Sequence, residues 1–113
     1  MGSDWQVNWH PAALEELGVV RDSGERGAIA HVIEKLEVDG PMLRSPHQSA
    51  VMGEPSGLRE LRPRRGHSRW RSLYRRIGPR RFAILAIAPE AGIDGAAFER
   101  GVRIAGRRLD ELH

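Results

Sequence analysis

The sequence predicts an α+β domain, in which helices pack on an antiparallel-rich sheet of four to five strands. An alternating segment near the N-terminus and three successive strand-like segments over 58–88 would form the sheet. Stretches with helical spacing lie before and after those three segments, and would form an N-terminal pair of helices and a C-terminal one. A chain of 113 residues suffices for one core, so we expect residues 1–113 to form a single domain.

The N-terminal segment is expected to form a strand followed by a short helix. Trp5, Val7 and Trp9 alternate with polar residues over 4–9, which is the pattern of a half-buried strand. Pro11 is well placed to begin a helix, because proline is tolerated at the first helical position. We expect this helix to run through Leu17 and to end at Gly18.

A second helix is expected between Ser23, as its N-cap, and Gly40-Pro41, which would stop it. One face of this helix is apolar at intervals of three and four residues, at Ile29, Val32, Ile33 and Leu36. We expect residues 41–50 to form a loop and Val51-Met52 to begin a short strand.

Three strands in succession are expected next, over Leu58–Arg62, Ser68–Ile77 and Arg81–Ala88. Glycine and proline mark the turns between them. The third segment is wholly apolar after its two arginines, as in a central strand that is covered on both faces. Asp94 is the expected cap of the last helix.

Arginine dominates the stretch from Arg59 to Arg81, which holds ten arginines and one acidic residue, Glu60. A guanidinium group suits phosphate because its fixed fork donates two parallel hydrogen bonds. The alternative is a solvated edge in an arginine-biased protein, since the whole chain has 17 arginines and one lysine.

Charge is unevenly divided along the chain. Residues 1–57 carry four basic and nine acidic side chains, a net charge of −5, whereas residues 58–113 carry 14 and six, a net charge of +8. Such a basic half indicates a polyanion or an acidic partner. The absence of cysteine excludes disulfides and zinc–thiolate sites, and we expect no metal and no small-molecule cofactor. No apolar run is long enough for a membrane span and no signal-peptide pattern begins the sequence, so we expect a cytoplasmic protein without membrane contact.

Two short motifs, in this order, resemble those of a known family. Gly57-Leu58-Arg59-Glu60-Leu61-Arg62 is similar to its G-L-x-E-L-R strand, and Trp70-Arg71-Ser72-Leu73-Tyr74 is similar to its aromatic-Arg-x-x-Tyr strand. With the preceding strand and helices, and the apolar strand and helix that follow, the chain resembles the RelE/HigB toxins of the RelE/ParE superfamily. The resemblance covers nearly the whole chain and is nearest to the phage-derived HigB-like branch.

This resemblance implies the toxin of a type II toxin–antitoxin system, which inhibits translation by cutting mRNA in the ribosomal A site. The expected partners are the ribosome, mRNA and a cognate antitoxin with a helix-turn-helix domain. Arg62 and Arg71 match the two motif arginines and would hold the scissile phosphate, while Tyr74 matches the motif tyrosine. We expect further RNA contacts from the remaining arginines of the hairpins: Arg59, Arg64, Arg65, Arg69, Arg75 and Arg76.

The implied reaction is metal-free attack of a ribose 2′-hydroxyl on the adjacent phosphorus. It requires a proton acceptor and a proton donor, and arginine is suited to neither role because it stays charged. His67 and Tyr74 are the nearest candidates, with the terminal His113 as a third. The other interpretation of His67 is a solvent-exposed turn residue.

One position departs from the family pattern. Members commonly carry a basic pair after the apolar strand, whereas this chain has Ala88-Pro89-Glu90. The departure favours an alternative function on the same fold, either a ParE-like gyrase inhibitor or a degenerate toxin that binds RNA without cutting it. A third possibility is a basic face that serves only an acidic partner protein.

Overall fold

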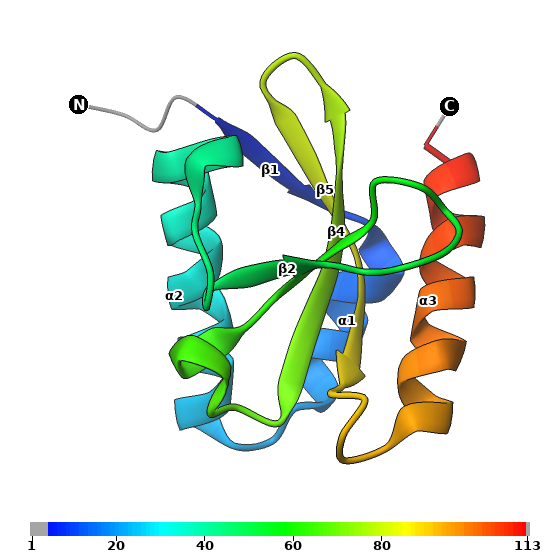
Figure 1. Cartoon of the computed structure of the whole chain (residues 1–113). Coiled ribbons are helices and arrows are strands. Elements are labelled where there is room, and N and C mark those ends of the chain that lie inside the picture. The colour runs from blue at the N-terminus through cyan, green and yellow to red at the C-terminus, as the bar shows by residue number, and fades with distance from the viewer. Residues whose placement is uncertain (1–4, 113) are drawn as a thin grey trace.

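The computed structural model describes residues 5–112, and β5 (Arg81–Pro89) is an interior strand of its five-stranded sheet. β1 (Gln6–Trp9) runs parallel to β5 on one side, and β4 (Trp70–Gly78) runs antiparallel on the other. β3 (Arg59–Leu61) and β2 (Gln48–Ala50) extend the sheet, giving the order β1-β5-β4-β3-β2. The antiparallel-rich sheet is therefore confirmed, with β1 as its one parallel strand among the described residues (Figure 1). The apolar β5 is an interior strand, as its sequence indicates, but β4 is the middle strand of the five.

Helices cover both faces of the sheet (Figure 1). α2 (Ser23–Asp39) packs on one face together with α1 (Pro11–Val19), and α3 (Gly95–Asp110) packs on the other. Each face has its own apolar core, and β5 contributes to both because its side chains alternate. The α+β prediction is confirmed. No helix in residues 5–112 is long and apolar enough to cross a membrane.

The helix ends differ from the prediction at two positions. Asp22, not Ser23, caps α2, because its Oδ1 accepts hydrogen bonds from the backbone N–H groups of Gly24 (2.8 Å) and Glu25 (3.2 Å). α1 continues through Gly18 to Val19 instead of ending at Gly18. Gly40 does end α2, as predicted.

Gly40 has a structural requirement for glycine. Its φ is +54°, and a Cβ at this position would lie 2.3 Å from Nε1 of Trp5. The short 3₁₀ turn η1 (Gly40–Met42) follows and leads the chain toward β2.

The edge strand lies earlier than predicted. We expected a strand at Val51-Met52, but β2 is Gln48–Ala50, which pairs with β3. The segment is polar, so it lacks the apolar signal of a strand, and the β3 backbone determines its position. Met52, which supplied that signal, is 90% exposed.

A second 3₁₀ turn separates β3 from β4. This turn, η2 (Pro63–Gly66), contains Arg64 and Arg65 in left-handed backbone conformations with φ of 54° and 57°. Such a conformation costs about 1 kcal/mol for a residue with a Cβ. Two successive arginines held in this way indicate that the surrounding structure determines the turn.

Side chains complete the hydrogen bonding of β5 beyond the end of β1. Oε1 of Glu16 in α1 accepts a hydrogen bond from the backbone N–H of Ile87 (3.0 Å), and Arg108 in α3 donates to the carbonyl of Leu85 (2.9 Å). Glu16 and Arg108 also form an ion pair of 2.8 Å. These contacts join both helices to β5 where β1 no longer pairs with it. Asp94 caps α3 as predicted, through a 3.0 Å hydrogen bond from the backbone N–H of Ala97.

Candidate functional site

The arginine-rich stretch is divided between the two faces of the sheet. Along β3 the side chains alternate, so Leu61 lies in the core on the α2 side, whereas Leu58 lies in the core on the α3 side. Glu60 and Arg62 therefore point to the α3 side, and Arg59 points to the α2 side. The predicted site residues consequently form two groups.

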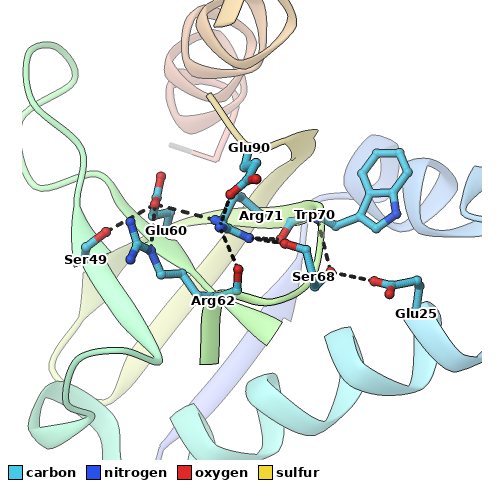
Figure 2. A network of polar contacts seen from close by, with 9 residues as sticks. Glu25, Ser49, Glu60, Arg62, Ser68, Trp70, Arg71 and Glu90 are labelled. Atoms are coloured by element: carbon cyan, nitrogen blue, oxygen red, sulfur yellow. Dashed lines mark hydrogen bonds and ion pairs between the residues drawn. The ribbon is translucent and has the colours of Figure 1, made fainter. Parts of the chain in front are cut away.

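On the α3 side, Glu60 is the centre of a polar network (Figure 2). Its Oε1 accepts hydrogen bonds from Nε of Arg62 (3.0 Å) and from Oγ of Ser49 (3.2 Å), and Nε of Arg71 lies 3.7 Å from the same oxygen. The structure thus brings Arg62 and Arg71 together, but through a carboxylate that lies between them.

Arg71 is buried, and protein groups bind both terminal nitrogens of its guanidinium, whereas its buried Nε has no hydrogen-bond partner among residues 5–112. Nη2 is paired with Oε2 of Glu90 at 2.5 Å, and Nη1 donates to the carbonyls of Ser68 (2.7 Å) and Trp70 (2.9 Å). Its side chain is only 4% exposed. Burial lowers the pKa of Arg71, and the charges of Glu90 and Glu60 act against this effect. Arg71 therefore acts within this network as a buried cation that holds two carboxylates in place.

Arg62 is the accessible arginine of the network. Its side chain is 36% exposed, and among residues 5–112 only its Nε takes part in a hydrogen bond, so both terminal nitrogens remain available. Oε2 of Glu60 is likewise without a hydrogen-bond partner among the described residues. An available guanidinium and an available carboxylate oxygen thus lie side by side.

A groove begins at Glu60 and runs between β2 and α3. Its volume is about 470 Å³, and its lining is largely apolar, with Arg103 and Glu99 as charged residues on the helix side. The apolar residues come from both walls: Val51 and Met52 on one side, Phe98 and Val102 on the other. Such a lining can hold a flat apolar group while the polar end holds a charged one.

Tyr74 lies on the other face of the sheet, away from this network. It is 2% exposed and packs against Phe82 with ring centroids 5.7 Å apart. Burial raises the pKa of Tyr74 to about 12, although nearby Arg59 acts in the opposite direction. At neutral pH this phenol is a protonated core residue.

The two histidine candidates lie elsewhere. His67 is exposed at the end of η2, where its backbone N–H bonds the carbonyl of Arg64 at 3.0 Å. His113 lies outside the described residues.

Most of the other predicted RNA-binding arginines are engaged by the protein itself. Arg59 donates to the side chain of Gln48 (2.7 Å), and Arg75 donates to the carbonyl of Ser56 (2.9 Å). Two further arginines lie over tryptophan rings, and a third is in an ion pair: Arg69 over Trp70, Arg76 over Trp5, and Arg64 with Glu25. Arg65 is exposed and has no such partner among residues 5–112.

Sequence reasoning did not assign a role to Glu60, Ser49 or the groove. Glu60 is the only acid between Arg59 and Arg81, and a lone carboxylate among ten arginines was the signal that could have found it. The sequence shows Glu90 as a departure from the family's basic pair. Its pairing with Arg71 could not be seen there, because the two residues are 19 positions apart in the chain. Within residues 5–112, no three histidine or acidic side chains lie where they could bind one metal ion.

The fold and the network define a small α+β protein with an arginine–glutamate site beside a groove. Residues 20–87 match the family described as "Phage derived protein Gp49-like (DUF891)", and the chain belongs to this family. The matched segment extends from just before α2 through most of β5, so it includes both motif strands. No curated protein matches the sequence.

The Gp49-like family is a family of RelE-like toxins. Membership therefore supports the predicted class, the toxin of a toxin–antitoxin system, and with it a cognate antitoxin as partner.

Proposed function

We propose that this toxin is an mRNA endonuclease that acts on the ribosome, at a site formed by Arg62, Glu60 and the groove along α3. One observation carries the proposal: Arg62 is bound through its Nε to Glu60, a residue that lines the groove, while the terminal nitrogens of Arg62 and Oε2 of Glu60 have no hydrogen-bond partner within residues 5–112. A cation for phosphate and a proton acceptor for a hydroxyl are two of the groups that RNA cleavage requires.

The reaction would proceed by attack of a ribose 2′-oxygen on the adjacent phosphorus. Oε2 of Glu60 takes the proton of the 2′-hydroxyl, and the terminal nitrogens of Arg62 stabilise the negative charge that develops on the phosphorane oxygens. The bond to the 5′-oxygen breaks, and this oxygen receives a proton from solvent water, because His67 lies outside the network. The products are a 2′,3′-cyclic phosphate and a 5′-hydroxyl.

Arg71 has a positioning role in this proposal. It is held by Glu90 and two carbonyl groups, and its Nε lies 3.7 Å from Glu60, so it fixes the Glu60 carboxylate without touching the RNA. The groove would hold a nucleobase next to the scissile phosphate, with Phe98 as the stacking surface. Stacking of a base on an aromatic ring contributes about 1–3 kcal/mol and does not depend strongly on sequence.

The test is a primer-extension map of mRNA in a bacterial translation reaction, with and without ribosomes. Wild-type protein is expected to produce cuts that require ribosomes, and Arg62→Ala to abolish them. Arg81→Ala is the matched control, because Arg81 is an exposed arginine at the far turn of the β4–β5 hairpin. Equal cutting by wild type and Arg62→Ala would refute the role of Arg62.

Glu60→Gln tests the proton acceptor separately from the shape of the site. Glutamine keeps a hydrogen-bond acceptor for Arg62 and Ser49 but cannot take a proton at neutral pH. Loss of a general base typically slows a reaction 10²- to 10⁴-fold, and we expect a decrease of about 10² or more. A rate within three-fold of wild type would assign proton transfer to another group.

A second candidate function is binding without cleavage, either inhibition of gyrase or occlusion of RNA. It is favoured by the pairing of Arg71 with Glu90, which removes one of two motif arginines from contact with phosphate. It predicts no cuts by a folded protein, and inhibition of gyrase supercoiling would identify the gyrase version. In either case we propose an antitoxin with a helix-turn-helix domain as the partner in the cytoplasm.

A further inference from the structure

A second basic cluster lies on the opposite side of the sheet from Glu60, between α2 and η2. A pocket of about 380 Å³ is lined there by five basic side chains and one valine: His31, Val32, Lys35, His47, Arg64 and Arg65. No carboxylate is among the lining residues. Arg64 is paired with Glu25 at 3.2 Å, whereas the other four basic groups have no ion pair among residues 5–112.

The backbone of η2 presents two of these side chains at a conformational cost. Arg64 and Arg65 are consecutive residues with positive φ, at positions where glycine or asparagine would be unstrained. Strained residues of this kind concentrate at sites that bind ligands, where the side chain has a use that offsets the strain. The exposed Arg65, without an ion-pair partner among the described residues, is therefore the key member of the cluster.

His47 shows the electrostatic character of the pocket. Burial lowers its pKa, and the positive charges of Lys35, Arg65 and His31 act in the same direction, while Asp39 opposes them. A bound anion would reverse the effect of these charges and favour protonated His47. The pocket is thus arranged for a negatively charged group, and its volume accommodates one phosphate with part of what it is attached to.

We propose that the pocket between α2 and η2 is a phosphate-binding site formed by Lys35, His47 and Arg65. Two sources of the phosphate are consistent with this chemistry: the backbone of a single-stranded RNA, or a terminal phosphate of a nucleotide. The backbone N–H of Arg62 donates to the carbonyl of His47 (2.8 Å), so the pocket adjoins the strand that carries the proposed active site. Binding here does not depend on cleavage, because Arg62 directs its side chain to the other face.

The experiment follows the histidine Cε1–Hε1 signals by NMR while inorganic phosphate is added at constant ionic strength, with chloride as the reference anion. Phosphate is expected to shift the His47 signal and to raise the pKa of His47. His47→Gln and His31→Gln assign the signals. In the Arg62→Ala protein phosphate is expected to shift the His47 signal as it does in wild type, because Arg62 does not line the pocket, so failure of the proposed cleavage and failure of this site give different results.

Lys35→Gln and Arg65→Asn are each expected to weaken phosphate binding roughly ten-fold, as for loss of one charged hydrogen bond. Asparagine tolerates the left-handed conformation, so Arg65→Asn removes the charge without straining η2. Arg21→Gln is the control, because it removes an exposed arginine outside the pocket. An unshifted His47 signal at tens of millimolar phosphate, or equal effects of all three variants, would overturn the proposal.

Two RNA oligonucleotides of the same sequence, one with a 5′-hydroxyl and one with a 5′-phosphate, distinguish the sources. If both oligonucleotides shift the His47 signal, and do so at a lower concentration than inorganic phosphate does, the pocket binds the RNA backbone. A shift by the phosphorylated oligonucleotide alone assigns a terminal phosphate. No shift by either, when inorganic phosphate also has none, counts against the site.

Discussion

The tyrosine of the second motif illustrates how one residue can resemble a catalytic group and yet form part of the core. Tyr74 matches the family motif by position, but its ring is 2% exposed and its partners are Phe82 and the rest of the α2-side core. Alternation along β4 determines this, because Arg71 and Tyr74 are three residues apart and therefore lie on opposite faces.

The ionisation of Tyr74 can be measured directly, since it is the only tyrosine in the sequence. With a pKa of about 12 in the folded protein and near 10 when unfolded, the phenol contributes stability that is fully present below pH 10. That contribution, about 2–3 kcal/mol, is lost as the pH rises through 12. Absorbance near 295 nm should therefore change only above about pH 11. In Tyr74→Phe this alkaline loss of unfolding free energy should be smaller, and an unchanged loss would contradict the assignment.

Glu90 is the second residue with a measurable role. Glu90→Ala removes the closest ion-pair partner of buried Arg71 and leaves only the more distant Glu60. Removing one partner of a buried pair is strongly destabilising, and because Glu90 is partly exposed we expect a loss of about 2 kcal/mol. Urea denaturation measures this, with Glu34→Ala, an exposed acid on α2, expected within about 0.5 kcal/mol of wild type. If Glu90→Ala is as stable as Glu34→Ala, Arg71 does not require this pairing.

At the scale of elements, the approach of α3 to the sheet depends on glycine. A Cβ at Gly101 would lie 2.9 Å from Cβ of Ala88 and 3.4 Å from Cδ1 of Leu73. The helix therefore packs so close to the sheet that only glycine fits at this position without a shift of its neighbours. Gly27 in α2, in contrast, faces open space. Both glycines are in helix interiors, where alanine is intrinsically more favourable than glycine by about 1 kcal/mol.

Alanine at these two positions should therefore change stability in opposite directions. Gly27→Ala is expected to raise the unfolding free energy by about 0.5–1 kcal/mol. Gly101→Ala is expected to lower it by about 1–2 kcal/mol, because overpacking outweighs the gain in helix propensity. Thermal and urea denaturation of both variants would show this. A stabilised Gly101→Ala would mean that α3 can move outward at little cost.

The elements that the sequence predicted well are those with strong periodicity. The apolar run of β5 identified an interior strand, and the stripe from Ile29 to Leu36 identified α2. Polar β2 had no such signal, and its place is determined by pairing with β3. In the site, the sequence could indicate arginine and its affinity for phosphate. It could not indicate that Glu90 would neutralise Arg71, because that contact depends on how β4 and β5 are aligned.

At the scale of the whole molecule, the acidic and basic halves of the sequence form different parts of the fold. The acidic first half contributes α1 and α2, and the basic second half contributes most of the sheet and α3. Three basic residues of the acidic half, Lys35, His31 and His47, meet Arg65 in the α2–η2 pocket. Basic groups thus gather on both faces near β3: Arg62 on the α3 side and the pocket on the α2 side.

This distribution predicts how RNA binding should depend on salt. A single strand that contacts three to five cationic groups should show a slope of about −2 to −3.5 in log K against log salt, because each neutralised phosphate contributes about −0.7. Affinity should then fall roughly 20- to 100-fold between 50 and 200 mM salt. Arg62→Ala and Arg65→Asn should each reduce the slope by about 0.7, measured by fluorescence anisotropy, whereas Arg81→Ala should not. Binding that is undetectable even at 50 mM salt would mean that the basic half serves an acidic partner protein, since counterion release makes phosphate contacts strongest at low salt.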